Sequence, residues 1–163
     1  MKRLLAFALP LALAPTSALA EPFSPSWTET FVLPSRRSET NASLWAQQDF
    51  YVGNFTGVTL FTEGTLTPPF PTTVTAGNYG WASVLTWIPG GHTYTYSTDL
   101  GNRTGNAKTC SWQLVVTLDS NRVCSGVLQQ AAAGTQGVQC AIDSAQSFID
   151  PVTCQSQVVT YIQ

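Results

Sequence analysis

The chain has 163 residues, of which 44% are hydrophobic and 10% are charged, and its formal net charge is −2. This length suits one domain with a hydrophobic core, and the lack of a basic cluster argues against nucleic acid as a partner. Because the charged fraction lies far below the typical value of about 25%, the surface must be wetted mainly by Thr, Ser, Gln and Asn. Threonine also favours β-strands.

The first twenty residues have the three parts of a secretory signal peptide. Met1–Arg3 carries two positive side chains, an apolar run follows from Leu4 to Ala14, and Ala18-Leu19-Ala20 offers the small residues of a cleavage site. The apolar run is about half the ~20 residues that a membrane-spanning helix needs, and no later segment is long and apolar enough to span a bilayer. The sequence therefore predicts a signal peptide over residues 1–20 and a secreted protein, extracellular or periplasmic.

Residues 21–42 are rich in Pro, Ser and Thr and are predicted to be an extended lead-in, in which Phe31–Leu33 can add a strand. Two alternating segments follow, residues 44–52 and 58–63, and the turn between them suggests a hairpin centred on Phe55. In that register Asp49 lies opposite Phe61 and Gln47 opposite Glu63. The apolar positions of both strands then share one face, the arrangement that fixes register, with Gln48 as the exception.

The rest of the chain reads as further strands separated by turns. Residues 67–71 are a proline-rich linker, since proline lacks the ladder donor. The expected strands span residues 79–88, 92–97, 110–118, 123–129, 138–142 and 152–162, and residues 141–149 can form a helical turn. About eight strands without a long helix predict an all-β fold, a single-domain antiparallel, jelly-roll-like β-sandwich over residues 43–163.

The strand at residues 79–88 is apolar on both faces. Tyr79, Trp81, Leu85 and Trp87 share one face, and Ala82, Val84 and Ile88 share the other. Such a strand is expected in the middle of the core. The alternative is an aromatic platform for a sugar or another protein.

The four cysteines, an even number in an exported chain, predict two disulfides among Cys110, Cys124, Cys140 and Cys154. Zinc is disfavoured, because the spacings lack C-x-x-C pairs and His92 is the only histidine. A hairpin turning at Ser120–Asn121 holds Cys110 and Cys124 too far apart for a bridge. The nested pairing, Cys124–Cys140 with Cys110–Cys154, is therefore expected over the sequential one.

The candidate ligand-binding residues lie on the face of the predicted hairpin that points away from the core: Trp45, Gln47, Asp49, Tyr51, Phe61 and Glu63. Exposed aromatic side chains beside polar groups usually bind something. Trp45 and Tyr51 are three alternate steps apart, about 20 Å, which is long enough to contact several consecutive sugars. The competing interpretation is that another strand or the proline-rich linker covers this face.

The leading functional hypothesis is a non-catalytic secreted module that binds a polysaccharide, glycan or cell surface. The first alternative is a self-assembling extracellular structural protein, such as a coat or appendage subunit. The second is a small glycoside hydrolase, in which Asp49 and Glu63 would lie about 7–8 Å apart between Cα atoms. No cofactor, metal or catalytic residue is expected: His92 near a turn is incidental, and Asp99, Asn102 and Asn106 suit turn chemistry.

The signal peptide leads to a direct prediction. Mass spectrometry of the exported protein should find Glu21 as the amino terminus, because signal peptidase cuts after the small residue Ala20. A mature product that retains Met1 would contradict it.

Overall fold

The computed structural model describes residues 23–36, 44–62 and 70–163. The predicted signal peptide, the end of the lead-in, Glu63 and most of the proline-rich linker lie outside these ranges. No helix within the described ranges is long and apolar enough to cross a membrane.

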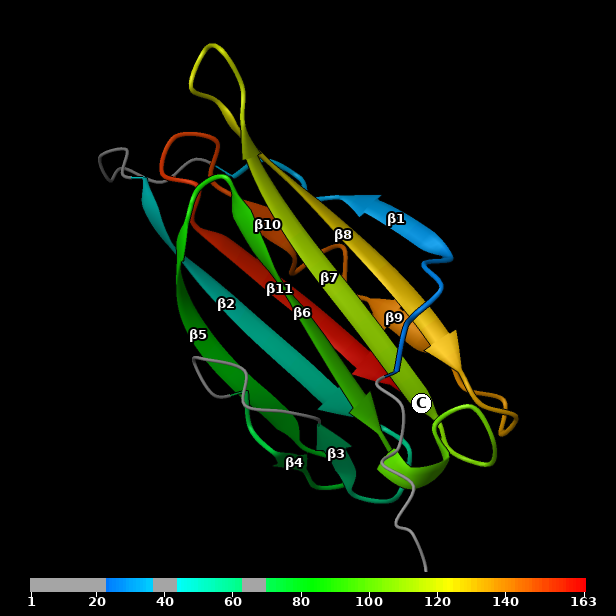
Figure 1. The fold of residues 1–163 in the computed structure, drawn as a ribbon. Helices are drawn as coiled ribbons and strands as arrows, with labels where there is room; N and C mark the ends of the chain where they lie inside the picture. The colour runs from blue at the N-terminus through cyan, green and yellow to red at the C-terminus, as the bar shows by residue number, and fades with distance from the viewer. Residues whose placement is uncertain (1–22, 37–43, 63–69) are drawn as a thin grey trace, which may run out of the picture.

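The fold is a sandwich of two β-sheets (Figure 1). One sheet has six strands in the order β1-β8-β7-β6-β3-β4, and the other has the order β10-β11-β2-β5 with β9 also paired to β11. The strands of the six-stranded sheet are β1 (Glu29–Val32), β8 (Cys124–Ala133), β7 (Thr109–Leu118), β6 (Gly90–Ser97), β3 (Leu60–Thr62) and β4 (Thr73–Val74). Those of the five-stranded sheet are β10 (Phe148–Ile149), β11 (Ser156–Ile162), β2 (Trp45–Asn54), β5 (Tyr79–Trp87) and β9 (Cys140–Ile142).

The all-β class, the sandwich and the two disulfides are as predicted. Each expected strand has a counterpart, and β1 overlaps the strand that Phe31–Leu33 was expected to add. Two further short strands occur, β4 and β10. Within residues 141–149 the backbone N–H of Ser147 donates to the carbonyl of Asp143 (2.9 Å), which closes one helical turn. The ladder between β11 and β2 is parallel, whereas the other ladders between the described strands are antiparallel.

The expected hairpin of residues 44–52 and 58–63 is wrong, because its two strands belong to different sheets. β2 pairs with β5 and β11, whereas β3 pairs with β4 and β6. The buried side chain of Asn54 fixes the change of direction: its Nδ2 donates to the carbonyls of Val58 and Val74, both at 2.7 Å, and its Oδ1 accepts from the backbone N–H of Thr56 at 3.0 Å. These bonds bend the chain out of one sheet and into the other.

Aromatic rings join the two sheets in the core. Phe50 of β2 packs against Phe70 and Tyr94 at centroid distances of 5.2 and 5.3 Å, and Tyr94 stacks on Trp112 at 5.3 Å. All four side chains are at most 4% exposed. The contacts run from the five-stranded sheet through β6 to β7, so they hold Phe50 and the other inward residues of β2 against the six-stranded sheet.

Both disulfides cross from one sheet towards the other. Cys110 of β7 bonds to Cys140 of β9, and Cys124 of β8 bonds to Cys154 in the turn before β11. The expected nested pairing is therefore wrong, although the β7–β8 ladder does separate Cys110 from Cys124 as predicted. The error has a physical reason: β9 adds to β11 in the opposite sheet and lies over the Cys110 end of β7, a long-range placement that local turns do not specify.

Removing a disulfide should destabilise this fold substantially. Each bridge closes 30 residues of chain, so replacing both Cys110 and Cys140 with Ala should lower the free energy of unfolding by about 3–4 kcal/mol. Chemical denaturation of the double variant against the parent measures this. Peptide mapping without reduction should recover the Cys110–Cys140 and Cys124–Cys154 linkages, and a Cys110–Cys154 peptide would contradict the fold.

Candidate functional site

The candidate site is the outer face of the five-stranded sheet, which we call the aromatic face. Side chains alternate across a strand, and the even-numbered residues of β2 and β5 point into the core. The odd-numbered residues therefore point away from it, and the register aligns them with the outward residues of β11. The aromatic face consists of Trp45, Gln47, Asp49 and Tyr51 of β2, Tyr79, Trp81, Ser83, Leu85 and Trp87 of β5, and Gln157, Val159 and Tyr161 of β11.

The expectation that residues 79–88 lie in the middle of the core is wrong. Among the described strands β5 lies at the edge of its sheet, and its large side chains on the aromatic face are about half exposed or more: 56% for Trp81, 63% for Leu85 and 49% for Trp87. The face assignment made from alternation is correct, since Ala82, Val84 and Ile88 are buried. Three of the five tryptophans of the chain thus lie on this exposed surface, at positions 45, 81 and 87.

One end of the aromatic face is formed by two indole rings. Trp45 and Trp87 are directly opposite each other on β2 and β5, and their rings meet edge to face with centroids 5.2 Å apart and an interplanar angle of 76°. Edge-to-face packing is a favourable arrangement for aromatic pairs. It fixes two rings that solvent reaches, so a ligand would meet an ordered surface at this end.

The other end is an aromatic cluster over a glycine. Phe55 packs edge to face with Tyr79 and Tyr161, at centroid distances of 5.9 and 5.8 Å. A Cβ at Gly53 would lie 2.9 Å from Cε1 of Tyr79 and 3.1 Å from Cε2 of Phe55. The rings therefore lie directly on the backbone of β2, which only glycine permits here.

Polar side chains line a groove between these ends. Gln47 donates its Nε2 to both carboxylate oxygens of Asp49, at 3.0 and 3.2 Å, which orients the acceptor. A hollow of about 460 Å³ is lined by Tyr51, Tyr79, Gln146, Gln157 and Val159. A smaller one of about 130 Å³ is lined by Gln47, Asp49, Phe148, Gln155, Ser156 and Gln157. Because Gln157 lines both, the two hollows adjoin along β11.

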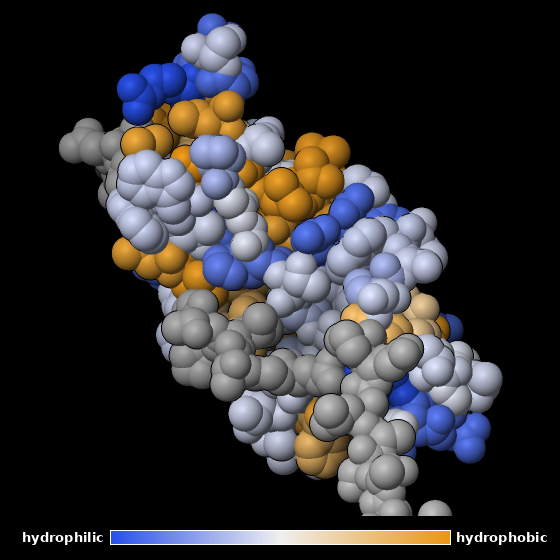
Figure 2. All heavy atoms as spheres, in the orientation of Figure 1, coloured by the Kyte–Doolittle hydropathy of each residue, from blue (hydrophilic) through white to orange (hydrophobic). Residues whose placement is uncertain are grey.

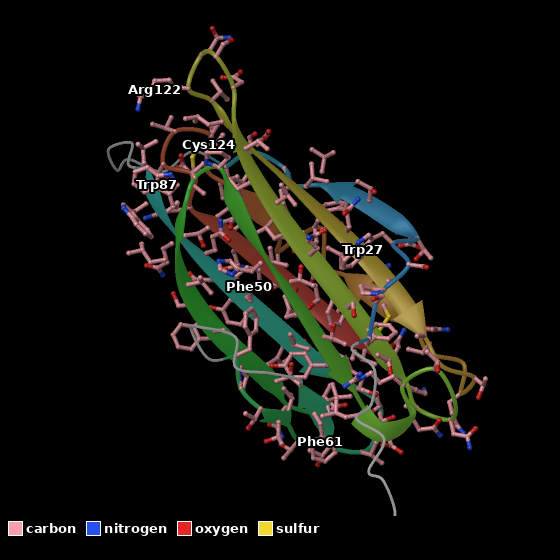
Figure 3. The ribbon with its side chains drawn as sticks, in the orientation of Figure 1. Trp27, Phe50, Phe61, Trp87, Arg122 and Cys124 are labelled. Carbon is pink, nitrogen blue, oxygen red and sulfur yellow. A yellow bond between two sulfur atoms is a disulfide. The ribbon has the colours of Figure 1, made fainter. Side chains whose placement is uncertain are left out.

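Four of the six predicted ligand-binding residues lie together on the aromatic face: Trp45, Gln47, Asp49 and Tyr51. Phe61 does not join them, because β3 is in the six-stranded sheet, and Figure 3 shows Phe61 and Trp87 at opposite ends of the molecule. Glu63 lies outside the described residues. The hairpin that was expected to set Asp49 beside Glu63 is not formed, because β2 and β3 belong to different sheets. The glycoside hydrolase alternative itself stays an untested hypothesis.

The aromatic residues of β5 were expected in the core, with an aromatic platform only as the alternative, and they were not predicted to share a face with Trp45 and Tyr51. The signal was present, since Trp81, Leu85 and Trp87 alternate in the same way as Trp45 and Tyr51. The strand was expected in the core because both of its faces are apolar. Gln157 carried no local signal, because it reaches the groove only through the parallel pairing of β11 with β2. Gln146 reaches the groove from the turn before β10, where its carbonyl accepts from Nε2 of Gln157 at 2.8 Å.

The outer face of the six-stranded sheet has a different character (Figure 2). Its outward-pointing residues are mostly Thr, Ser and Gln. One set of cross-strand neighbours, for example, consists of Thr30, Gln129, Gln113 and Thr93. Figure 2 shows this side with several separate hydrophobic patches among polar side chains, and Val32 and Val115 are exposed on this sheet. Among the described residues, exposed aromatic rings are thus concentrated on the five-stranded sheet.

His92 and Asp99 have structural partners. The ring of His92 lies against Phe50, with centroids 6.0 Å apart, and its Nε2 is 2.6 Å from Oγ1 of Thr86. Burial lowers the pKa of His92. Asp99 caps the short 3-10 helix η1 (Leu100–Asn102), since its Oδ1 accepts from the backbone N–H of Gly101 at 2.9 Å. No group of three or more potential metal ligands occurs in the described part of the chain.

Comparison of the chain with protein-family models, curated proteins and solved structures finds no match. The residues of the aromatic face are therefore the basis on which a function can be assigned.

The packing of His92 predicts a pH dependence of stability. Because the pKa of His92 is lower in the folded protein than its ordinary value of 6.5, the unfolded chain takes up a proton first as the pH falls. The free energy of unfolding should thus decrease between about pH 7 and about pH 5.5, where carboxylates stay ionised. Denaturation of His92→Gln in the same range should give a flatter dependence, and equal slopes for the two proteins would contradict this role.

Proposed function

We propose that this protein is a secreted, non-catalytic module that binds an extended polysaccharide through its aromatic face. The observation that carries the proposal is the row of exposed rings on a sheet whose opposite side already forms the core. Exposed apolar area of this kind is costly unless a partner uses it, and contiguous patches usually mark binding sites.

The chemistry of the face suits sugars. A pyranose ring has an apolar face of C–H groups that stacks on an indole or phenol ring, and hydroxyls around its rim that need donors and acceptors. Trp81 and Tyr51 are direct neighbours on β5 and β2, while Gln157 and the oriented carboxylate of Asp49 line the adjoining hollow. An amide supplies both a donor and an acceptor, and a carboxylate accepts.

The charge of the face favours a neutral glycan. Within β2, β5 and β11, Asp49 is the only charged residue. An acidic polysaccharide would gain no cationic partner from these strands and would be repelled by Asp49. The extent of the face favours a chain over a single sugar: Trp45 and Tyr51, or Trp81 and Trp87, are each three alternate steps apart, about 20 Å.

The proposal predicts which rings matter. Trp45→Ala, Tyr51→Ala and Trp81→Ala should each weaken binding to a neutral polysaccharide by roughly tenfold, about 1.4 kcal/mol. Depletion isotherms of the exported protein on cellulose, chitin, xylan and mixed β-glucan provide the measurement. Because Trp45 and Trp81 are about half exposed, the melting temperature of these two variants should change little.

Phe61→Ala is the matched control. It removes a ring of 41% exposure from the other sheet, so it should leave the isotherm unchanged. The proposal fails if the parent protein binds none of the neutral polysaccharides, or if Phe61→Ala weakens binding as much as Trp81→Ala. A loss of about 3–5 kcal/mol of stability in Trp45→Ala would instead assign that ring to the core.

A further inference from the structure

The free edge of β5 is a second feature of the aromatic face. Among the described strands, β5 is paired with β2 on one side and ends the sheet on the other. It has nine residues, and its sequence, YGWASVLTW, contains no charge and no proline. Natural sheets usually protect an edge with Lys, Pro, a bulge or a very short strand. An edge strand of this length without such protection is a template for another strand.

The direction of the backbone groups follows from two hydrogen bonds. The N–H of Ile88 donates to the carbonyl of Leu44 at 2.8 Å, and the N–H of Asn54 donates to the carbonyl of Asn78 at 2.9 Å. Hydrogen-bonded and non-hydrogen-bonded pairs alternate along an antiparallel ladder. The even-numbered residues of β5 therefore point their N–H and C=O groups at β2, and the odd-numbered residues point theirs at the free edge.

The strand is complementary to itself. If two copies pair antiparallel about a two-fold axis at Ser83, the residue numbers of opposed pairs sum to 166, which uses all nine residues. Each Tyr79 then lies opposite the Trp87 of the partner copy, and each Trp81 opposite the other Leu85. Every opposed odd-numbered pair carries free backbone groups, so donors meet acceptors along the whole strand, while exposed apolar side chains meet on the aromatic face.

We propose that two copies of this chain form a symmetric dimer by antiparallel pairing of their β5 edges, centred on Ser83. The pairing joins two five-stranded sheets into one continuous sheet. It also joins the two aromatic faces side by side into one surface that is twice as wide across the strands. The interface is isologous, so it closes at two copies. The dimer does not depend on what the face binds, and a failure to bind polysaccharide would leave it standing.

The test is the oligomeric state of the exported protein in solution. Sedimentation velocity over a range of concentrations should find a dimer for the parent chain. Ser83→Lys places two positive charges opposite each other at the axis and should give a monomer. Ser125→Lys is the matched control, since it adds the same charge at an exposed position of β8 in the other sheet, and it should remain a dimer.

A pair of proline variants tests the direction of the backbone groups. Ser83→Pro removes an N–H that points at the free edge, so it should abolish the dimer and keep the monomer folded. Ala82→Pro removes an N–H that points at β2 and should lower the melting temperature markedly. Circular dichroism checks whether each variant is folded. If Ser83→Pro does not fold, the oligomeric state of Ser83→Lys tests the dimer instead. A parent chain that stays monomeric at all concentrations, or a Ser83→Lys variant that stays dimeric, overturns the inference.

Discussion

The aromatic contact between the sheets determines how the rest of the molecule is arranged. Phe50 is held by Phe70 and Tyr94, and Tyr94 by Trp112, so β2 cannot rotate or slip by one residue without removing Phe50 from the core. With Phe50 inside, Asp49 and Tyr51 must face outwards. Because β5 and β11 are in register with β2, the same contact determines the outward residues of three strands. The inward residues of these strands fill the core, and the residues that alternate with them therefore form the aromatic face.

The connections between the sheets keep that arrangement in place. Asn54 bends the chain from β2 towards β3 with buried side-chain hydrogen bonds, and each disulfide ties a strand of the six-stranded sheet to a segment of the other layer. The five-stranded sheet therefore presents its rings on a fixed scaffold. A fixed surface loses little conformational entropy when a ligand binds, which favours affinity from a few stacked rings.

Alternation along one strand predicts which side chains of that strand share a face. It does not predict which distant strand the segment pairs with. Alternation correctly separated Trp45 from Ala46 and Trp81 from Ala82, and it gave the strands and the sandwich class. It could not tell whether β2 turns back on itself or pairs with β5, because both arrangements bury the same side of β2. The pairing of Cys110 with Cys140 failed for the same reason, since β9 adds to β11 across the sandwich. Asn54 was the local signal for the sheet change, but its two carbonyl partners include Val74, twenty residues on.

The odd-numbered residues of β5 connect the two proposals. The same alternation that turns Trp81, Leu85 and Trp87 outwards turns their N–H and C=O groups towards the free edge. A carbohydrate would use the side chains and leave the backbone edge free, whereas a second copy would use the edge and leave the rings on one joined surface. The two partners therefore do not compete for the same atoms. Two-fold pairing also closes the edge, so it opposes unlimited growth through β5, and an open filament of the kind a coat subunit forms would need a different surface. The proposed dimer would pair the uncharged edge of β5 with a second copy, and it would widen the aromatic surface across the strands.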